Sequence, residues 1–382
     1  MTPSLSSPHI AIIGAGIIGL SCAWELAKRG AQVTIYDKNE PGRGASWAAA
    51  GMLAPAYEAA AEEGAHPRLF DLCMESAALW PGFADAIGRA SGRNLGFSAG
   101  PSLALAFDAS EAAGLQNLRD ALERHNVESD MLGADAIRQI EPAVSPDVEA
   151  ALNLPTDGQI DNRAIVTALI AALSDHASVR FVVGQAPLED RGGRLHLPGH
   201  DIILAAAGWS TASIKVEQNG QLYSLVNWDT ALDEIDCYGG QMLSVARGPG
   251  LPSMTVRCGG IYIAPKPDRI IIGATMEQGV ATDHADADTI AGLRADAARL
   301  CPAIAGATQL ETWAGVRPGT ADHAPLIGRT QAKDLFVASG HYRNGILLAP
   351  VTAQIMADMV LEGKTSALAA AFSPARFAAA TA

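Results

Sequence analysis

The stretch that decides the fold is His9–Asp37, HIAIIGAGIIGLSCAWELAKRGAQVTIYD. An apolar, β-branched run leads into the glycine turn GAGIIG at 14–19, and a helix-like segment follows to Arg29. A second strand-like run then ends in the acidic residue Asp37. A strand, a glycine turn, a helix, a second strand and an acid in this order predict the first βαβ unit of a dinucleotide-binding fold.

Each glycine of this turn has a distinct expected role. Gly14 allows the tight turn, Gly16 allows the backbone to approach a pyrophosphate, and Gly19 allows the helix to pack closely on the strand. The diphosphate would lie on the unpaired N–H groups at the positive end of the helix. Asp37 is placed to accept hydrogen bonds from a ribose diol.

Composition narrows the class of protein. The 382 residues are 49% hydrophobic and 18% charged, which is typical of a soluble globular enzyme with two domains. The 27 basic and 41 acidic residues give a net charge of −14, and the basic residues are scattered. Nucleic acid and anionic membranes are therefore not expected as partners. The five cysteines form no C-x-x-C, so neither a disulfide framework nor a metal site is predicted.

The start of the chain has no pattern of a secretory signal, and the apolar residues 10–20 are too few to span a bilayer. A cytoplasmic protein is expected. Residues 54–67 are predicted to be an acidic loop, either a lid or a solvated connection. A helix is predicted over 69–87 with an interruption at Trp80-Pro81-Gly82, and 215–236 is predicted to be a long surface loop.

Three sequence blocks resemble a known family, the FAD-dependent oxidases of the D-amino-acid oxidase type. The blocks are the glycine turn continued by GASWAAAGMLAP at 44–55, WAGVRPGTADHAPLIG at 313–328 and GHYRNGILLAP at 340–350. The last two are specific, because a dinucleotide fold alone does not require them. The resemblance covers nearly the whole chain, is weakest at 211–241, and is strongest to the glycine oxidases of thiamine biosynthesis.

The resemblance implies an α/β fold with two domains: a discontinuous Rossmann-type FAD-binding domain and an inserted α+β substrate domain of mainly antiparallel sheet. The FAD-binding domain is predicted over 1–88, 147–211 and 309–366. The substrate-binding domain is predicted over 89–146 and 212–308, and 367–382 is expected to be a tail.

FAD is implied as the cofactor, bound non-covalently, because Ala48 stands where relatives with covalent FAD carry a His. Others carry a Cys near position 317, where this chain has Val316 and Arg317. Gly345 is expected to open the last helix, with its N-terminus towards the flavin ring. The positions implied to contact FAD are Gly14, Gly16, Ile17, Ile18, Gly19, Asp37, Lys38, Arg43, Ala45, Ser46, Ala49, Gly51, Met52, Ala186, Trp209, Arg317, Arg343, Asn344, Gly345 and Ile346.

The same resemblance makes Arg317 the clamp for a substrate carboxylate, since a planar guanidinium holds a carboxylate through two parallel hydrogen bonds. Tyr262 would be a second donor and a catalytic residue with Arg317, although it also fits an ordinary strand tyrosine. Met276 would line the pocket or fill the core. Arg343 would contact flavin, substrate or both.

The implied activity is oxidative deamination of glycine or another small amino acid or amine, with O₂ as the acceptor and a homo-oligomer as the assembly. A D-amino-acid or sarcosine-type oxidase, or an FAD dehydrogenase with another acceptor, remains open. Two further alternatives are a NAD-linked dehydrogenase on the same nucleotide fold and a non-catalytic nucleotide-binding subunit.

Overall fold

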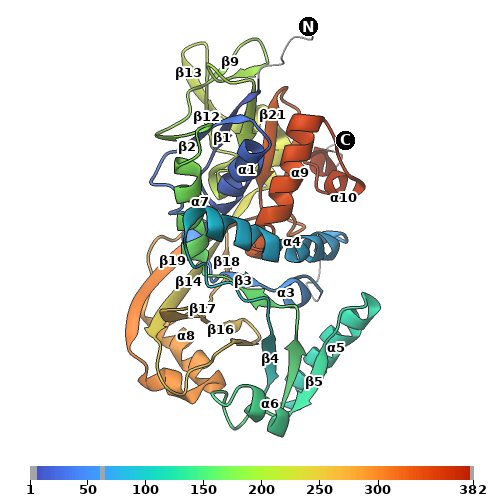
Figure 1. Ribbon diagram of the computed structural model, residues 1–382, viewed down its shortest axis with the longest axis vertical. Helices are drawn as coiled ribbons and strands as arrows, with labels where there is room; N and C mark the ends of the chain where they lie inside the picture. The colour runs from blue at the N-terminus through green and yellow to red at the C-terminus, as the bar shows by residue number, and fades with distance from the viewer. Residues whose placement is uncertain (1–6, 61–64, 379–382) are drawn as a thin grey trace.

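The computed structural model describes residues 7–60 and 65–378, which form two large sheets and the helices that cover them (Figure 1). The first sheet has the strand order β20-β21-β11-β1-β2-β8 and is parallel except for β20. Its strands are β1 His9–Ile13, β2 Gln32–Asp37, β8 Val179–Val183, β11 Ile202–Ala205, β20 Leu326–Arg329 and β21 Leu335–Ser339. Strands from both ends of the chain therefore pair in one sheet, as expected of a discontinuous domain.

Helices cover one face of this parallel sheet, and a small sheet covers the other. The helices on the sheet are α1 Ile17–Lys28, α7 Asn162–Ser174 and α9 Ala349–Glu362, and α4 Leu69–Ser91 packs on α7 and α9. The small sheet has the order β10-β9-β12-β13, with β9 Leu188–Asp190, β10 Leu195–His196, β12 Lys215–Gln218 and β13 Gln221–Ser224. The apolar side chains of β1 alternate between the two faces, so that Ile10 and Ile12 pack under the helices while Ala11 and Ile13 pack under the small sheet.

The second large sheet has the order β18-β14-β17-β16-β15-β4-β6-β5, with β19 also paired to β14. Its strands are β4 Ser102–Ala106, β5 Asp130–Gly133, β6 Ala150–Leu154, β14 Asp236–Ala246, β15 Thr255–Cys258, β16 Ile261–Pro265, β17 Arg269–Gly273, β18 Glu277–Gln278 and β19 Gln309–Gly319. All of its pairings are antiparallel except β15 with β4. The predicted fold class, a Rossmann-type domain with an inserted and mainly antiparallel α+β domain, is confirmed.

Shorter elements complete the chain. They are α2 Ala45–Ala48, β3 Met52–Leu53, α3 Pro55–Ala60, α5 Ala109–Arg124, α6 Ala134–Ile140, β7 Gly158–Gln159, α8 Ala287–Leu300, α10 Ala367–Ala371, α11 Ala375–Ala378, and the 3₁₀ turns η1 Gly208–Ser210, η2 Leu225–Asn227, η3 Thr230–Glu234, η4 Pro302–Gly306 and η5 Tyr342–Asn344. Figure 1 shows α4 and β3 at the junction between the parallel sheet above and the large antiparallel sheet below.

The predicted domain boundaries stay a prediction, and three strand assignments do not follow them. The strands β6 and β19 belong to the large sheet, although both fall in segments predicted for the FAD-binding domain. The hairpin β12–β13 joins the small sheet on the parallel one, although it falls in a predicted substrate-domain segment. The described part of the predicted tail, 367–378, forms α10 and α11, whereas 379–382 lie outside the described residues. The buried Phe372 lies in the same core as α1 and α9.

Three local predictions are wrong. Residues 55–60 of the expected loop form α3, whereas 61–64 lie outside the described residues. The helix α4 continues through Pro81, because the exposed proline faces solvent while the neighbouring Trp80 is buried and donates from Nε1 to the Leu347 carbonyl at 2.8 Å. The expected surface loop 215–236 begins with a β-hairpin and continues in two 3₁₀ turns.

Candidate active site

The glycine turn after β1 lies very close to the neighbouring backbone at Ala206, which only residues without a side chain allow. Gly14 has a φ of 115°, and a Cβ there would lie 2.3 Å from the Ala206 carbonyl oxygen. Only glycine fits such a conformation and such an approach. A Cβ on Gly19 would lie 1.9 Å from the Gly14 oxygen, so Gly19 is required for the packing of α1 on β1. Gly19 does not line the cavity described below, and its expected contact with the cofactor stays a prediction.

The N-terminus of α1 is open to an anion. Its N-cap, Gly16, has no side chain to accept a hydrogen bond from the first turn, and the Ile17 N–H donates to Ser46 Oγ at 2.9 Å. Asp37 follows β2 and accepts from the Ala15 N–H at 2.8 Å and the Asn39 N–H at 2.9 Å. These bonds fix the carboxylate beside the turn, where it can also accept from a ribose hydroxyl.

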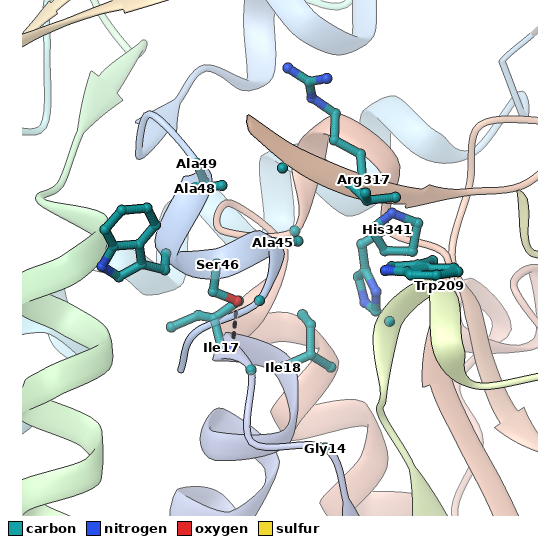
Figure 2. Close-up of a pocket in the computed structure, with 18 of the residues that line it drawn as sticks. Gly14, Ile17, Ile18, Ala45, Ser46, Ala48, Ala49, Trp209, Arg317 and His341 are labelled. Carbon is teal, nitrogen blue, oxygen red and sulfur yellow. Dashed lines mark hydrogen bonds between the residues drawn. The ribbon is translucent and has the colours of Figure 1, made fainter. Parts of the chain in front are cut away.

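A cavity of about 1130 Å³ runs from this turn to the large sheet. Its volume exceeds the roughly 300–1,000 Å³ of sites for drug-sized ligands, so a dinucleotide and a small substrate fit together. Apart from Gly19, all the residues expected to contact FAD line it: Gly14, Gly16, Ile17, Ile18, Asp37, Lys38, Arg43, Ala45, Ser46, Ala49, Gly51, Met52, Ala186, Trp209, Arg317, Arg343, Asn344, Gly345 and Ile346. Figure 2 shows Gly14 at one end of this cavity and the Arg317 guanidinium at the other, with Ser46 between them.

Arg317 presents a guanidinium that lacks an acidic partner among the described residues. It lies on β19, and its Nη1 donates weakly to two carbonyl oxygens, that of Thr275 at 3.3 Å and that of Gly239 at 3.5 Å. A buried or half-buried guanidinium is normally paired with an anion. The position therefore suits a carboxylate that arrives with a ligand.

Tyr262 and Met276 lie in the wall of the same cavity. The Tyr262 hydroxyl donates to Met242 Sδ at 3.0 Å, a weak acceptor that a carboxylate oxygen can replace. Burial raises the pKa of Tyr262, so its phenol stays protonated and able to donate. Met276 is 40% exposed and accepts from the Tyr342 hydroxyl, so it lies at the rim of the cavity rather than in a core.

Arg343 is held by Glu58, which sequence reasoning did not single out. Its Nε lies 2.7 Å from Glu58 Oε2, and both side chains line the cavity. Glu58 is on α3, in the segment predicted to be an acidic loop or lid, and its carboxylate is buried. The acidic composition of that segment was the available signal, but nothing local distinguishes a buried glutamate from a solvated one.

His341 is a second residue that sequence reasoning did not single out, although it belongs to the GHYRNGILLAP block. Its ring is buried, lines the cavity and makes a hydrogen bond with Thr352 Oγ1 at 3.1 Å. Burial lowers the pKa of His341 to about 3, so the ring is neutral at physiological pH. The helix α9 begins at Ala349, after the 3₁₀ turn η5, so the expectation that Gly345 opens it is wrong.

The residues present fit FAD. The N-terminus of α1, whose N-cap Gly16 has no capping side chain, the glycine approach at Ala206 and the fixed Asp37 carboxylate match a pyrophosphate and a ribose. Gly51 gives a second close approach, since a Cβ there would lie 2.1 Å from the Ile160 carbonyl oxygen. Apart from Trp47, the residues at 44–51 are Gly, Ala and Ser, and all of them line the cavity.

A family model described as "FAD dependent oxidoreductase" (DAO) matches residues 9–359. The chain belongs to this family. FAD is accordingly the cofactor, and the resemblance to the D-amino-acid oxidase type is confirmed. As an FAD-dependent oxidoreductase, the protein would hold the dinucleotide along α1 and Asp37 and the ring system towards Arg317; non-covalent attachment stays a prediction.

The FAD-dependent oxidoreductase is 33% identical over 386 residues to the bifunctional protein ThiO/ThiG of Trichormus variabilis, covering 96% of this chain and 55% of that protein. It thus spans about half the length of this relative. It is 30% identical over 380 residues to a glycine oxidase of Geobacillus kaustophilus, covering 96% of each chain. The crystal structure of the glycine oxidase from Geobacillus kaustophilus matches with a TM-score of 0.83 at 30% identity, over 97% of this chain and 99% of that one.

Proposed function

We propose that this protein oxidises glycine or another small amino acid or amine to the corresponding imine, which water hydrolyses to a carbonyl product (a 2-oxo acid for an amino acid) and ammonia. The observation that carries the proposal is the Arg317 guanidinium, which lines the FAD cavity without an acidic partner among the described residues. The likeness to glycine oxidases supports the substrate class. FAD, when bound, supplies the acceptor for a hydride, and O₂ is proposed as the final acceptor, giving H₂O₂.

The protein side chains act mainly by positioning. Arg317 binds the carboxylate and so fixes the direction of the Cα–H bond, which is worth several kcal/mol of an otherwise bimolecular barrier. Tyr262 supplies a second donor to the same carboxylate once its hydroxyl leaves Met242 Sδ. Neither group is a base, so neither is assigned the proton that the amine loses before its Cα–H bond breaks.

The His341 ring is neutral, so it can line the cavity and form hydrogen bonds without adding charge there. Elsewhere in the cavity wall, Glu58 forms an ion pair with Arg343. Of the arginines that line the cavity, Arg43 and Arg343 have carboxylate partners, whereas Arg317 has none within the described residues and is proposed as the anchor for an anionic ligand. A role of the product imine in thiazole synthesis for thiamine is part of the proposal, motivated by the relatives named ThiO/ThiG.

No helix in the described part of the chain is both long and apolar enough to cross a membrane. The cytoplasm, the homo-oligomeric state and the acceptor O₂ stay predictions. Anaerobic mixing of the purified, FAD-loaded protein with glycine, sarcosine, D-alanine and D-proline tests the activity. We expect the flavin absorbance near 450 nm to fall with at least one of them; an absorbance unchanged by all four would refute the proposal. Peroxide formed on admitting air distinguishes an oxidase from a dehydrogenase.

A further inference from the structure

A second cavity of about 480 Å³ lies against the first. Its walls come from α3, α5, β4 and β15, and they include Tyr57, Leu115, Leu118, Arg257 and Gly259. Glu58 and Arg343 line both cavities, so their ion pair stands between the two. The proposed function uses only the first cavity.

Two glycines of one turn also lie next to the cavities. Gly260 lines the first cavity and Gly259 lines the second, and a Cβ built on either glycine meets no atom within 4 Å. Both glycines of this turn between β15 and β16 are exposed, so a Cβ on either would meet open space. No side chain of these two residues would therefore obstruct a substrate chain longer than glycine.

Arg257 provides an anchor at the far end of that route. Its side chain is only 2% exposed, and Nη1 donates to Glu58 Oε1 at 3.3 Å. Its Nε and Nη2 have no hydrogen-bond partner within the described residues. The guanidinium lies 4.3 Å from the centroid of the Tyr57 ring. Buried N–H groups without acceptors cost free energy, and a charged acceptor relieves that cost best.

The sheet register places Arg257 beside the proposed carboxylate donor. Arg257 on β15 is directly opposite Tyr262 on β16, so both side chains project from the same face of the sheet. Cross-strand neighbours have Cβ atoms about 5 Å apart, so the two side chains start close together on that face. One carboxylate held by Arg317 and Tyr262 and another held by Arg257 can therefore belong to one small molecule.

The other charges near Arg257 leave it available. Both oxygens of Glu111 lie 3.0 Å from Arg299 Nη2, so Glu111 is already paired. Asp157 is fully buried, does not line the cavity and interacts electrostatically with Arg257. It accepts hydrogen bonds from the backbone N–H groups of Ala56 and Tyr57. Burial raises the pKa of Asp157 to about 6. Glu58 is shared between Arg257 and Arg343.

We propose that the second cavity is an anion subsite of the same active site, and that the protein accepts amino acids carrying a second carboxylate, which Arg257 binds. This inference rests on the proposed function, because it takes the carboxylate at Arg317 as the first anchor. It goes beyond that function in naming diacidic amino acids as substrates and Arg257 as the residue that selects them.

Isothermal titration calorimetry on the FAD-loaded protein at pH 7.5 tests the subsite with two acids that cannot be deaminated, pentanedioate (glutarate) and pentanoate. They share a five-carbon chain and differ in the second carboxylate. We expect the wild-type protein to bind glutarate at least about tenfold more tightly, the increment of a charged hydrogen bond. Arg257→Met should remove this preference and leave pentanoate affinity unchanged, and Arg257→Lys should retain part of it.

Gly260→Val provides a second test that keeps every charge, since the new side chain would occupy the open space next to this turn. We expect it to reduce glutarate affinity more than pentanoate affinity, and it decides the matter if Arg257→Met does not fold. Equal affinities for the two acids in the wild-type protein, or a preference that survives both substitutions, would overturn the subsite. Oxidation of glycine without any glutarate preference would overturn the subsite alone, whereas a flavin that no amino acid reduces would overturn the proposed function.

Discussion

Replacing Arg317 by alanine would remove the guanidinium that we propose binds the substrate carboxylate. In the absence of substrate this side chain makes two long hydrogen bonds, to the carbonyl oxygens of Thr275 and Gly239. Its removal should therefore change the free energy of unfolding by no more than about 0.5 kcal/mol. The substrate, in contrast, would lose a charged hydrogen bond worth about 1.5–3 kcal/mol.

That loss corresponds to a dissociation constant about tenfold to a hundredfold higher. The assay is anaerobic stopped-flow reduction of the bound flavin over a range of glycine concentrations, which gives the dissociation constant separately from the limiting rate. Arg317→Lys keeps the charge but not the planar fork, so we expect an intermediate loss. Arg124→Ala, at the exposed end of α5, is the matched control and should have no effect.

The reasoning would be refuted by a dissociation constant for glycine that stays within about twofold of wild type in Arg317→Ala. A similar loss in Arg124→Ala would show that the effect is not specific to the site. Thermal unfolding of each variant provides the check that the fold is intact.

Three further predictions concern the cofactor, the stability and the pH dependence. Gly14→Ala places a Cβ 2.3 Å from the Ala206 oxygen at a φ of 115°, so the purified variant should lose most of its FAD, measured as the ratio of absorbance at 450 and 280 nm; full FAD content would contradict this. Asp161→Ala leaves the 8%-exposed Arg269 side chain with the exposed Asp268 as its remaining carboxylate partner, and it removes the N-cap of α7. The free energy of unfolding in urea should therefore fall by about 3–5 kcal/mol, and a change below about 1 kcal/mol would contradict this. The folded pKa of His341, about 3, lies below its ordinary 6.5, so between these pH values the unfolded chain binds a proton that the folded chain does not. The free energy of unfolding should therefore fall as pH decreases from about 6.5 towards 3. Urea titrations of His341→Gln should show a weaker dependence on pH.

The dinucleotide unit could be predicted because its signals are local. The glycine spacing, the helix and Asp37 lie within one short segment, and each one limits the backbone directly. The structure supports the packing role assigned to Gly19 but removes it from the cavity wall. The role of Arg317 as a carboxylate clamp was predicted only from the resemblance of one sequence block to a family, since a single arginine before Pro-Gly has no local signature of function.

The buried charges could not be predicted, because their partners are distant in sequence. Glu58 and Arg257 are 199 residues apart, and only the fold brings α3 against β15. The same is true of Asp161 and Arg269, which join the cap of α7 to the large sheet. A glutamate in an acidic stretch and an arginine between apolar residues each look like surface residues.

One of the wrong predictions had a local signal. Asn219-Gly220 lies between the short runs KVEQ and QLYS, and Asn-Gly is a strong indicator of a two-residue hairpin turn. Both residues have positive φ, at 53° and 81°, as that turn requires. The polar composition of 215–236 favoured a loop, but β12 pairs with β9 and buries Val216.

A crystal structure of the FAD-loaded protein with glycolate tests the central claim most directly, because glycolate has the carboxylate of glycine but no amine to oxidise. We expect its carboxylate within hydrogen-bond distance of the Arg317 guanidinium and its α-carbon facing the flavin ring. A glycolate bound elsewhere, or a flavin remote from Arg317, would contradict the account.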